Sequence, residues 1–462
     1  MRDDESLALN PAATAPSGAA APADAPGAGP GAAPGPPLPA RWIRRLVVVA
    51  LILAALNLRP AITSLGALLK EVRDGLGMSG TMAGLLTSVP AACFALFGFA
   101  APRLARRYGP GAVVCAGMAA ITAGLLLRPL AGGTPVFLAT SALALAGIAV
   151  SNVLMPVIVK RYFPDRVGTV TGVYSMALSL GTSVAAAVTV PLTDAMGGSW
   201  RLGLGMWAVL AALAILPWLP LVRDRSGQQP PRPRAVRGAA ATEAGAPVTG
   251  PAPAAGSAST PAPAPAPGEH GRIGRSRTAR VLAGYFGLQG TAAYVTMGWM
   301  PQIFRDAGLS ADKAGLLLAV TMALGVPLSF VLPLLAARMR SQAPIVVVLA
   351  AFQIAGFAGL WAAPAAAPWV WAALLGVANC AFPLVLTMIG MRARSGPGVV
   401  RLSAFAQSSG YLLAIPGPIL VGTLNQATGG WGLPMALMLV LVVPQVLCGV
   451  LAGRNRHVED EL

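Results

Sequence analysis

Charge is scarce in this sequence. Charged residues make up only 11% of the 462 residues, and hydrophobic residues make up 55%. Because an average soluble protein carries about 25% charged residues, a soluble globular chain is excluded. The sequence contains two histidines, His270 and His457. No Asp or Glu lies well inside an apolar run. An intramembrane enzyme needs an acid, a base, a nucleophile or a metal cluster at depth, so we expect no enzyme, no catalytic residue, no metal and no cofactor.

Paired cysteines and a signal peptide are lacking as well. The four cysteines, Cys93, Cys115, Cys380 and Cys448, lie inside apolar runs without the spacing of a disulfide framework or a metal site. The first 40 residues are rich in Ala, Pro and Gly and begin acidic, unlike a signal peptide. The net charge of +17 comes mainly from arginines between apolar runs, so we expect no nucleic-acid partner.

What is present is a series of apolar runs. A helix needs about 20 such residues to cross a bilayer, and we count about twelve candidates. They cover 46–69, 81–101, 111–127, 135–159, 167–192, 202–222, 281–304, 314–337, 344–363, 369–391, 399–424 and 432–451. The sequence therefore predicts an all-α polytopic membrane protein. We expect a disordered tail over 1–41, a six-helix bundle over 42–222, a disordered Pro/Ala-rich linker over 223–279, a second six-helix bundle over 280–453 and a tail over 454–462.

Lys and Arg are concentrated in every second connection between the runs. The first of these groups are Arg41, Arg44 and Arg45, and then Arg103, Arg106 and Arg107. An excess of Lys and Arg marks the cytoplasmic side of a membrane protein. We therefore expect both termini, the linker and the last tail in the cytoplasm, and we place the chain in a bacterial cytoplasmic membrane as a monomer.

Two internal echoes indicate that the two bundles are repeats. Ser79 followed by 83–86 (Ala-Gly-Leu-Leu) is repeated at Ser310 followed by 314–317, and Asn152 with Pro156 is echoed by Asn379 with Pro383. Two halves of the same orientation imply a pseudo-twofold axis along the membrane normal, with a binding site between the halves.

The first apolar run contains a charge. Arg59 lies about two thirds of the way along it, where a guanidinium costs at least about 2.5 kcal/mol unless it meets water, a partner or a ligand. Pro60 has no amide hydrogen, so it is expected to kink the helix and free the carbonyl of Leu56. We interpret this stretch as the wall of a cavity. The alternative is that Arg59 reaches the headgroups or binds a neighbouring helix.

A single uncompensated guanidinium at depth favours a small anion, or a strong hydrogen-bond acceptor such as a nitro group. Around it we place neutral polar and aromatic residues from several runs, each of which has helix-to-helix hydrogen bonding as its alternative role. The candidate substrate-binding residues are Arg59, Asn57, Tyr294, Trp299, Asn379, Gln407, Tyr174, Asn152 and Gln289.

The motifs resemble those of a known family. Two six-helix halves, a long linker and a basic connection after the second run resemble the major facilitator superfamily. Within it, residues 57–60 (Asn-Leu-Arg-Pro), 287–289 (Gly-Leu-Gln) with Tyr294 and 299–301 (Trp-Met-Pro), and 406–408 (Ala-Gln-Ser) with Tyr411 resemble the cyanate and nitroimidazole transporters. The resemblance implies an alternating-access transporter of a small anionic or nitro-bearing solute.

The resemblance also implies a cytoplasmic gate in the loop between the second and third helices, formed here by Arg103, Arg106, Arg107 and Gly109. Relatives usually have an acidic residue where this chain has Arg106, so the ion pair made by that carboxylate must be absent or replaced. A drug or metabolite exporter of the same superfamily and a non-transporting membrane sensor remain alternatives. Deletion of residues 229–268 separates the sensor from a transporter, because only signalling should need the linker.

Overall fold

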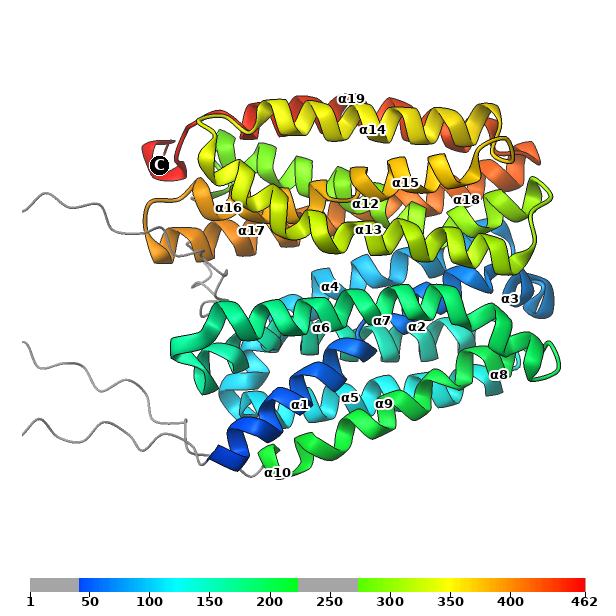
Figure 1. Ribbon diagram of the computed structural model, residues 1–462, viewed down its shortest axis with the longest axis horizontal. Coiled ribbons are helices and arrows are strands. Elements are labelled where there is room, and N and C mark those ends of the chain that lie inside the picture. Colours follow the sequence, from blue (N-terminus) through cyan, green and yellow to red (C-terminus); the bar gives the residue numbers. More distant parts are fainter. Residues whose placement is uncertain (1–40, 223–272, 462) are drawn as a thin grey trace, which may run out of the picture. The chain divides into compact units, whose positions relative to one another are not determined.

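Long helices run from one end of the protein to the other. The computed structural model describes residues 41–222 and 273–461, so the predicted tail and linker fall almost wholly outside the described residues. In these ranges, eleven segments are long and apolar enough to cross a membrane. A further helix, α12 (Arg277–Asp306), has 30 residues but falls outside that set. The chain is a multi-pass, all-α membrane protein (Figure 1).

The helices of the first half precede residue 223. They are α1 (Arg41–Asn57), α2 (Pro60–Ala67), α3 (Leu69–Leu76), α4 (Gly80–Tyr108), α5 (Pro110–Leu127), η1 (Arg128–Leu130), α6 (Thr134–Tyr162), η2 (Pro164–Arg166), α7 (Val167–Ala195), α8 (Trp200–Gly205), α9 (Trp207–Ile215), η3 (Leu216–Trp218) and α10 (Leu219–Val222). The second half contains α12, α13 (Ala311–Arg338), α14 (Ala343–Ala362), α15 (Pro368–Ala378), α16 (Ala381–Met391), α17 (Gly396–Ala414), α18 (Pro416–Thr428), α19 (Gly432–Ala452) and η4 (Val458–Glu461).

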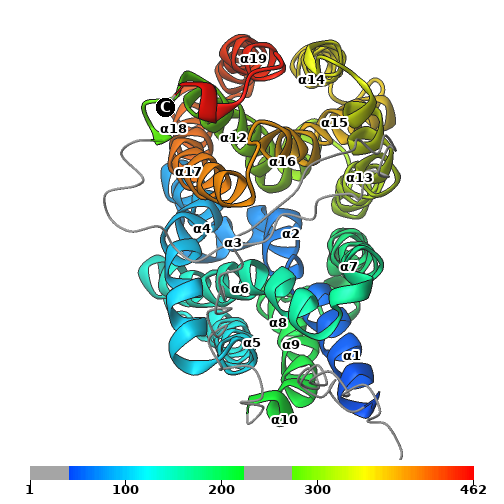
Figure 2. The same ribbon diagram turned by 90° about the vertical axis from the view of Figure 1, so that its left-hand side faces the viewer.

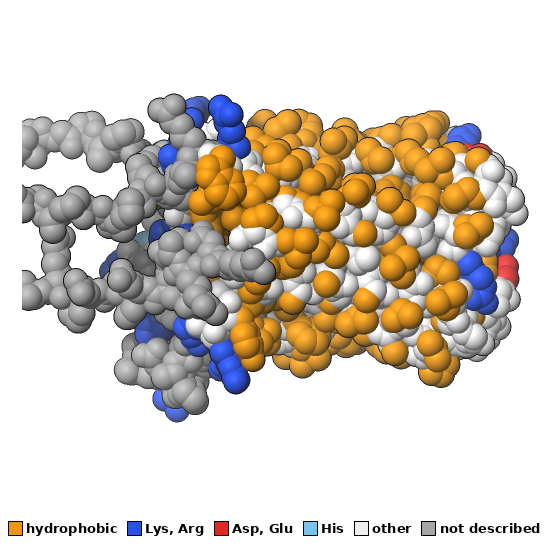
Figure 3. Space-filling view, turned by 90° about the horizontal axis from the view of Figure 1, so that it is seen from below, with side chains coloured by type: hydrophobic (Ala, Val, Ile, Leu, Met, Phe, Trp, Pro, Cys, Tyr) orange, Lys and Arg blue, Asp and Glu red, His pale blue; other side chains and the backbone are white. Residues whose placement is uncertain are grey.

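Seen end-on, the helices of each half form their own group (Figure 2). The groups meet where α7 packs against α13, α4 against α17 and α18, and α2 against α12. We call the end that carries Arg44, Arg106, Arg338 and Arg454 the basic end; it is on the left in Figure 1. The other is the opposite end. Between the ends, hydrophobic side chains cover much of the face in Figure 3, as contact with lipid requires.

One of the sequence echoes has the same structural role in both halves. Ser79 is the N-cap of α4 and accepts a hydrogen bond from the amide of Met82 at 3.2 Å. Ser310 is the N-cap of α13 and accepts from the amide of Lys313 at 3.3 Å. In each case a capping oxygen satisfies an amide that the first helical turn leaves unpaired. The repeated serines therefore begin the equivalent second helix of each bundle.

Close helix contacts join the halves at the opposite end. A Cβ atom on Gly80 would lie 2.5 Å from the carbonyl oxygen of Gly422, and one on Gly84 would lie 2.6 Å from that of Pro418. We call this contact of α4 with α18 the glycine seam. The sequence analysis did not assign these glycines a partner, and the structure shows that they permit backbone contact between the two halves.

The last residues fold back onto the basic end of the second half. Glu461 accepts hydrogen bonds from Ser276 Oγ at 2.6 Å and from the amide of Thr278 at 2.9 Å, at the start of α12. Glu459 accepts from the amides of Arg394 at 3.0 Å and Ser395 at 3.3 Å, just before α17. The tail thereby ties together helix ends that are far apart in the sequence.

Candidate functional site

The first membrane helix is interrupted at Arg59. α1 ends at Asn57 and α2 begins at Pro60, which has no amide hydrogen to donate to the carbonyl of Leu56. The carbonyl of Arg59 accepts from the amides of Ile62 at 3.0 Å and Thr63 at 3.1 Å, so the new helix begins at once. Arg59 lies in this break, and its side chain is half-buried.

Helix α7 packs directly against this break. A Cβ on Gly181 would lie 2.5 Å from the carbonyl oxygen of Leu56, so only glycine allows this approach. Asn57, on the other side, donates from Nδ2 to the carbonyls of Leu53 at 2.8 Å and Leu210 at 3.1 Å. Its amide nitrogen therefore holds α1 against α9, which positions the break from which Arg59 projects.

A second break lies in the other half. α15 ends at Ala378 and α16 begins at Ala381, with Asn379 and Cys380 between them and Pro383 in the first turn of α16. Within a membrane, a break in a helix is tolerated where it is buried in protein or lines a water-filled cavity. The two breaks face the same space.

That space is a cavity of about 190 Å³ between the two halves. Its lining comes from α7 and the Arg59 break in the first half, and from α12, α13, α16 and α17 in the second. Polar lining residues are Arg59, Ser179, Thr182, Tyr294, Thr321, Ser329, Asn379 and Tyr411. Since both halves supply polar groups, a ligand in this cavity would contact both.

Arg59 is the charged member of the lining. Tyr294 and Tyr411 line the same cavity, and none of the described residues that line it is acidic. Within the described ranges, no ion pair of Arg59 is present. The cavity therefore offers a positive charge with hydrogen-bond donors and without a protein counter-ion.

A second arginine supports α2 from behind. Arg128 is fully buried, donates from Nη1 to the carbonyl of Ala61 at 3.2 Å, and lies over the ring of Phe137 at 5.5 Å. Ala61 is the second residue of α2, directly after Pro60. Arg128 thus holds the start of α2, the helix that begins at the Arg59 break. The sequence did not indicate this role, because Arg128 lies in a short connection between two apolar runs.

Of the nine predicted binding residues, the structure brings Arg59, Tyr294 and Asn379 into the cavity lining. Gln289 accepts at 2.7 Å from Gln445, which also bonds to Gln353, so its amide belongs to a buried network of the second half. Trp299 is fully buried and packs edge-on against Trp431, with ring centroids 5.8 Å apart. These two side chains serve helix packing in this conformation.

The remaining predicted residues lie elsewhere. Gln407 donates to Ser403 Oγ at 2.6 Å on its own helix, α17. Tyr174 packs against the apolar core of the first half, and Asn152 is half-buried on α6. The predicted loop-gate residues Arg103, Arg106 and Arg107 belong to the last turns of α4, and Gly109 ends that helix with a φ of 87°.

The sequence analysis missed several residues of the lining, among them Ser179, Thr182, Thr321, Ser329 and Phe382. Ser and Thr on α7 carry no distinctive pattern, because similar residues occur throughout the helices. Phe382 directly precedes Pro383, and this proline in an apolar run was the available signal for the second break.

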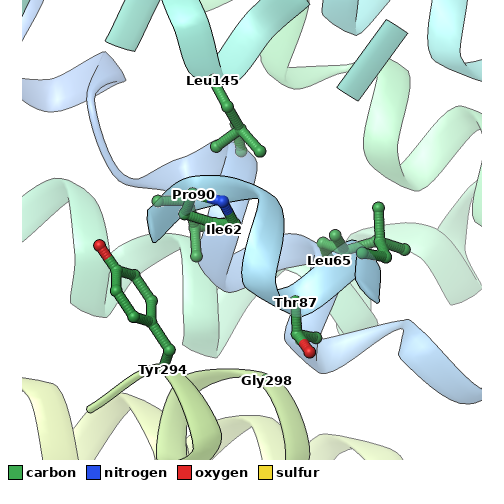
Figure 4. Close-up of a pocket in the computed structure, with 10 residues that line it drawn as sticks. Ile62, Leu65, Thr87, Pro90, Leu145, Tyr294 and Gly298 are labelled. Atoms are coloured by element: carbon green, nitrogen blue, oxygen red, sulfur yellow. The ribbon is translucent and has the colours of Figure 1, made fainter. Parts of the chain in front are cut away.

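A much smaller cavity, about 10 Å³, lies between α2, α4 and α12, closer to the opposite end. Figure 4 shows Tyr294 across from Pro90 and Ile62, and Thr87 near Gly298. This volume is about that needed for a single water. Tyr294 lines both cavities and therefore stands between the large cavity and this narrow one.

Contacts between the halves are concentrated beyond Tyr294, toward the opposite end. Glu71 on α3 pairs with Arg305 at the end of α12, and Thr81 bonds to Gln426 and Thr423 across the glycine seam. One apolar cluster also contains residues of both halves, among them Leu65, Leu86, Val190, Trp299, Ile303, Leu317 and Val421. The opposite end is therefore closed.

Comparisons with known proteins agree with this architecture. A family model described as Major Facilitator Superfamily matches residues 47–418. The chain is 30% identical to the uncharacterized transporter YycB of Bacillus subtilis (strain 168), covering 89% of this chain and 94% of that protein. It is 30% identical to the 2-nitroimidazole transporter of Escherichia coli (strain K12), covering 90% and 97%. The cyanate transport protein CynX of the same organism is 28% identical, covering 86% and 94%.

Solved structures agree on the fold. A bacterial homolog of the human lysosomal transporter Spinster, inward-facing and occupied, superposes with a TM-score of 0.68 at 16% identity, covering 90% of this chain and 98% of that chain. The D-xylose–proton symporter gives 0.64 at 12% identity, covering 90% and 99%.

Proposed function

Because the chain belongs to the major facilitator superfamily, we propose that this secondary transporter moves a small anionic or nitro-bearing solute across the bacterial cytoplasmic membrane by alternating access. The observation that carries the proposal is Arg59, a half-buried cation without an acidic partner in a cavity lined by both halves. An anion there offsets the cost of burying the guanidinium. Relatives named as cyanate and 2-nitroimidazole transporters support this substrate class.

The conformation is that of an inward-facing carrier, in our proposal. We place the basic end in the cytoplasm because Lys and Arg concentrate there. The ion pair, the glycine seam and the shared apolar cluster then close the outer side of the cavity. Rocking the two halves would open these contacts and bring the basic ends together, while Arg59 stays at the centre.

The test is current across vesicle membranes that contain the purified protein. Cyanate, nitrate, formate and benzoate are added in turn, and radiolabelled 2-nitroimidazole uptake is measured in parallel because the neutral compound carries no current. We expect saturable uptake or current in the wild type and a loss of at least about tenfold in Arg59→Gln, since one charge-assisted interaction contributes about 1.5–3 kcal/mol.

Arg340→Gln is the matched control, because Arg340 is an exposed arginine at the basic end. It should transport like the wild type. Undiminished transport by a folded Arg59→Gln variant would contradict the assignment of the site. Absence of movement for all of these solutes would contradict the proposed substrate class.

A further inference from the structure

The size of the central cavity argues against a very small ligand. Its volume is about 190 Å³, and a cavity of roughly 150 Å³ is sufficient to hold benzene. A water molecule takes about 30 Å³, so a linear anion of three atoms would leave most of the space to water. The cavity is large enough for one six-membered ring.

Aromatic side chains form one wall of this cavity and are held in place from behind. Tyr411 and Phe382 belong to the lining. The buried ring of Phe286 contacts both, with centroid distances of 5.0 Å to Tyr411 and 5.1 Å to Phe382, and Phe94 stacks on Tyr411 at 5.2 Å. Rings fixed in this way form a preformed surface for another ring.

Arg59 supplies charge at the same cavity. A guanidinium matches a carboxylate with two parallel hydrogen bonds, whereas a neutral nitro group accepts hydrogen bonds without offsetting the charge. Ser179 and Thr182 add hydroxyl groups from α7. The lining therefore combines one positive charge, an aromatic wall and a few neutral polar groups.

We propose that the preferred substrate is a planar aromatic monocarboxylate with a single ring, whose carboxylate binds Arg59 while its ring packs against Phe382 and Tyr411. This inference rests on the proposed function, because it names the substrate class of the same cavity. Phe382 is then a specificity-determining residue, and small linear anions are poor substrates.

The experiment measures uptake of radiolabelled benzoate by vesicles containing the full-length protein. Cyanate, cyclohexanecarboxylate and benzamide serve as competitors. Cyclohexanecarboxylate keeps the charge but has a saturated ring, and benzamide keeps the ring but is neutral. We expect saturable benzoate uptake, at least about tenfold weaker competition by cyanate and by benzamide, and about 2- to 10-fold weaker competition by cyclohexanecarboxylate.

Two variants test the aromatic wall. Phe382→Leu should raise the half-saturating concentration of benzoate about 2- to 10-fold while its maximal rate changes less. Phe382→Tyr keeps the ring and should keep benzoate affinity within about twofold of the wild type, which separates loss of the ring from misfolding. Equal affinity of Phe382→Leu and the wild type for benzoate would contradict the role of this wall.

The outcomes also separate the two proposals. Arg59-dependent transport of cyanate or formate without transport of benzoate, or tighter binding of cyanate than benzoate, overturns the aromatic substrate and leaves the anion transporter standing. Uptake of 2-nitroimidazole alone overturns the aromatic carboxylate and leaves the proposed function standing. If benzoate, the small anions and 2-nitroimidazole all fail to move, both proposals fail.

Discussion

Glu71 and Arg305 form a two-point ion pair that joins the two halves of the protein. The Nη1–Oε2 distance is 2.8 Å and the Nη2–Oε1 distance is 2.6 Å, and both side chains are mostly shielded from solvent. Glu71 lies on α3, which follows α2, and Arg305 lies near the end of α12. A paired guanidinium and carboxylate of this geometry hold one arrangement of the halves.

Removal of this ion pair is expected to open the opposite end. For Glu71→Gln we expect the closed arrangement to lose about 1–2 kcal/mol, which changes the ratio of closed to open molecules about 5- to 30-fold. Spin labels at the exposed positions Asp74 and Asp312, in a background without native cysteines, report the distance between the halves.

Asp194→Asn is the control for that measurement, because Asp194 is exposed at the end of α7. It should leave the distance distribution unchanged. The exchanged pair Glu71→Arg with Arg305→Glu should restore the closed population. An identical distribution for Glu71→Gln and the wild type would show that the pair does not hold the closed state.

The glycine seam gives a second prediction. A methyl group in Gly84→Ala would lie 2.6 Å from the carbonyl oxygen of Pro418, so α4 and α18 must separate. We expect an open opposite end and at least about tenfold slower turnover, because the carrier can no longer close on that side. The rate is measured as uptake by vesicles.

Gly98→Ala is the matched control on the same helix, because a Cβ at Gly98 meets no atom within 4 Å. Helix propensity favours both alanine substitutions to the same degree, so the difference between them isolates the contact with α18. Equal turnover of the two variants would contradict the importance of the seam.

The folded tail predicts a pH dependence of stability. Burial raises the pKa of the Glu461 carboxyl, but hydrogen bonds from Ser276 and Thr278 outweigh it, so the pKa lies below its ordinary value. A carboxyl with a lowered folded pKa stabilises the fold above its unfolded pKa of about 4.3, and this contribution is lost as pH falls through the folded pKa. Glu459 has a lowered pKa for the same kind of reason.

Glu461→Gln should therefore lower the unfolding temperature at pH 7, with a cost of about 1 kcal/mol as for a lost helix cap. The difference from the wild type should shrink near pH 4 and below, as measured by thermal unfolding in detergent. Asp74→Asn, at an exposed carboxyl on α3, is the control. A difference that is constant with pH would contradict the hydrogen-bonded carboxylate.

The glutamine network provides a prediction on stability alone. Gln445 donates to Gln289 at 2.7 Å and to Gln353 at 2.8 Å, and all three side chains are buried. Gln445→Leu leaves two buried amides without their partner, at a cost of about 1–3 kcal/mol. Thermal unfolding is the measurement.

Replacement of all three glutamines by Leu should recover part of the lost stability, because no buried amide of the network is then left unpaired. If the Gln445→Leu variant unfolds at the same temperature as the wild type, the hydrogen bonds of this network do not contribute to the stability of the protein.

The fold was largely predictable from the sequence, because apolar runs and their basic connections specify helices and their alternation. Even the break at Arg59–Pro60 was indicated, since proline cannot donate a helical hydrogen bond. The direction in which each polar side chain points was not predictable from the sequence. Gln289 and Asn379 both lie in apolar runs, yet one bonds to Gln445 and the other lines the cavity. In helices that are apolar on nearly all sides, periodicity does not define the rotation about the axis.

The repeated pattern at Ser79 and Ser310 indicated two equivalent halves, and the structure shows that both serines are helix caps. The second break was not predicted. Asn152 and Asn379 are echoes in the sequence, and α6 continues through Asn152 whereas the helix is interrupted at Asn379. Each asparagine is followed four residues later by a proline, yet Pro156 lies inside the continuous α6, so this motif by itself does not specify a break.

The polarity of α12 has a consequence for how the protein is made. This helix contains Gln289, Gln302 and Arg305 and is buried along most of its length by other helices. On insertion scales, each such residue opposes entry of an isolated helix into lipid. Among the long helices of the described ranges, α12 is the one that falls outside the set of apolar spans, so it is poorly able to enter the bilayer unaided. During synthesis Glu71 of the first bundle is already present to pair with Arg305, but Gln445 of α19, the partner of Gln289, is made last. We therefore expect stable integration of α12 to be completed together with assembly of the second bundle.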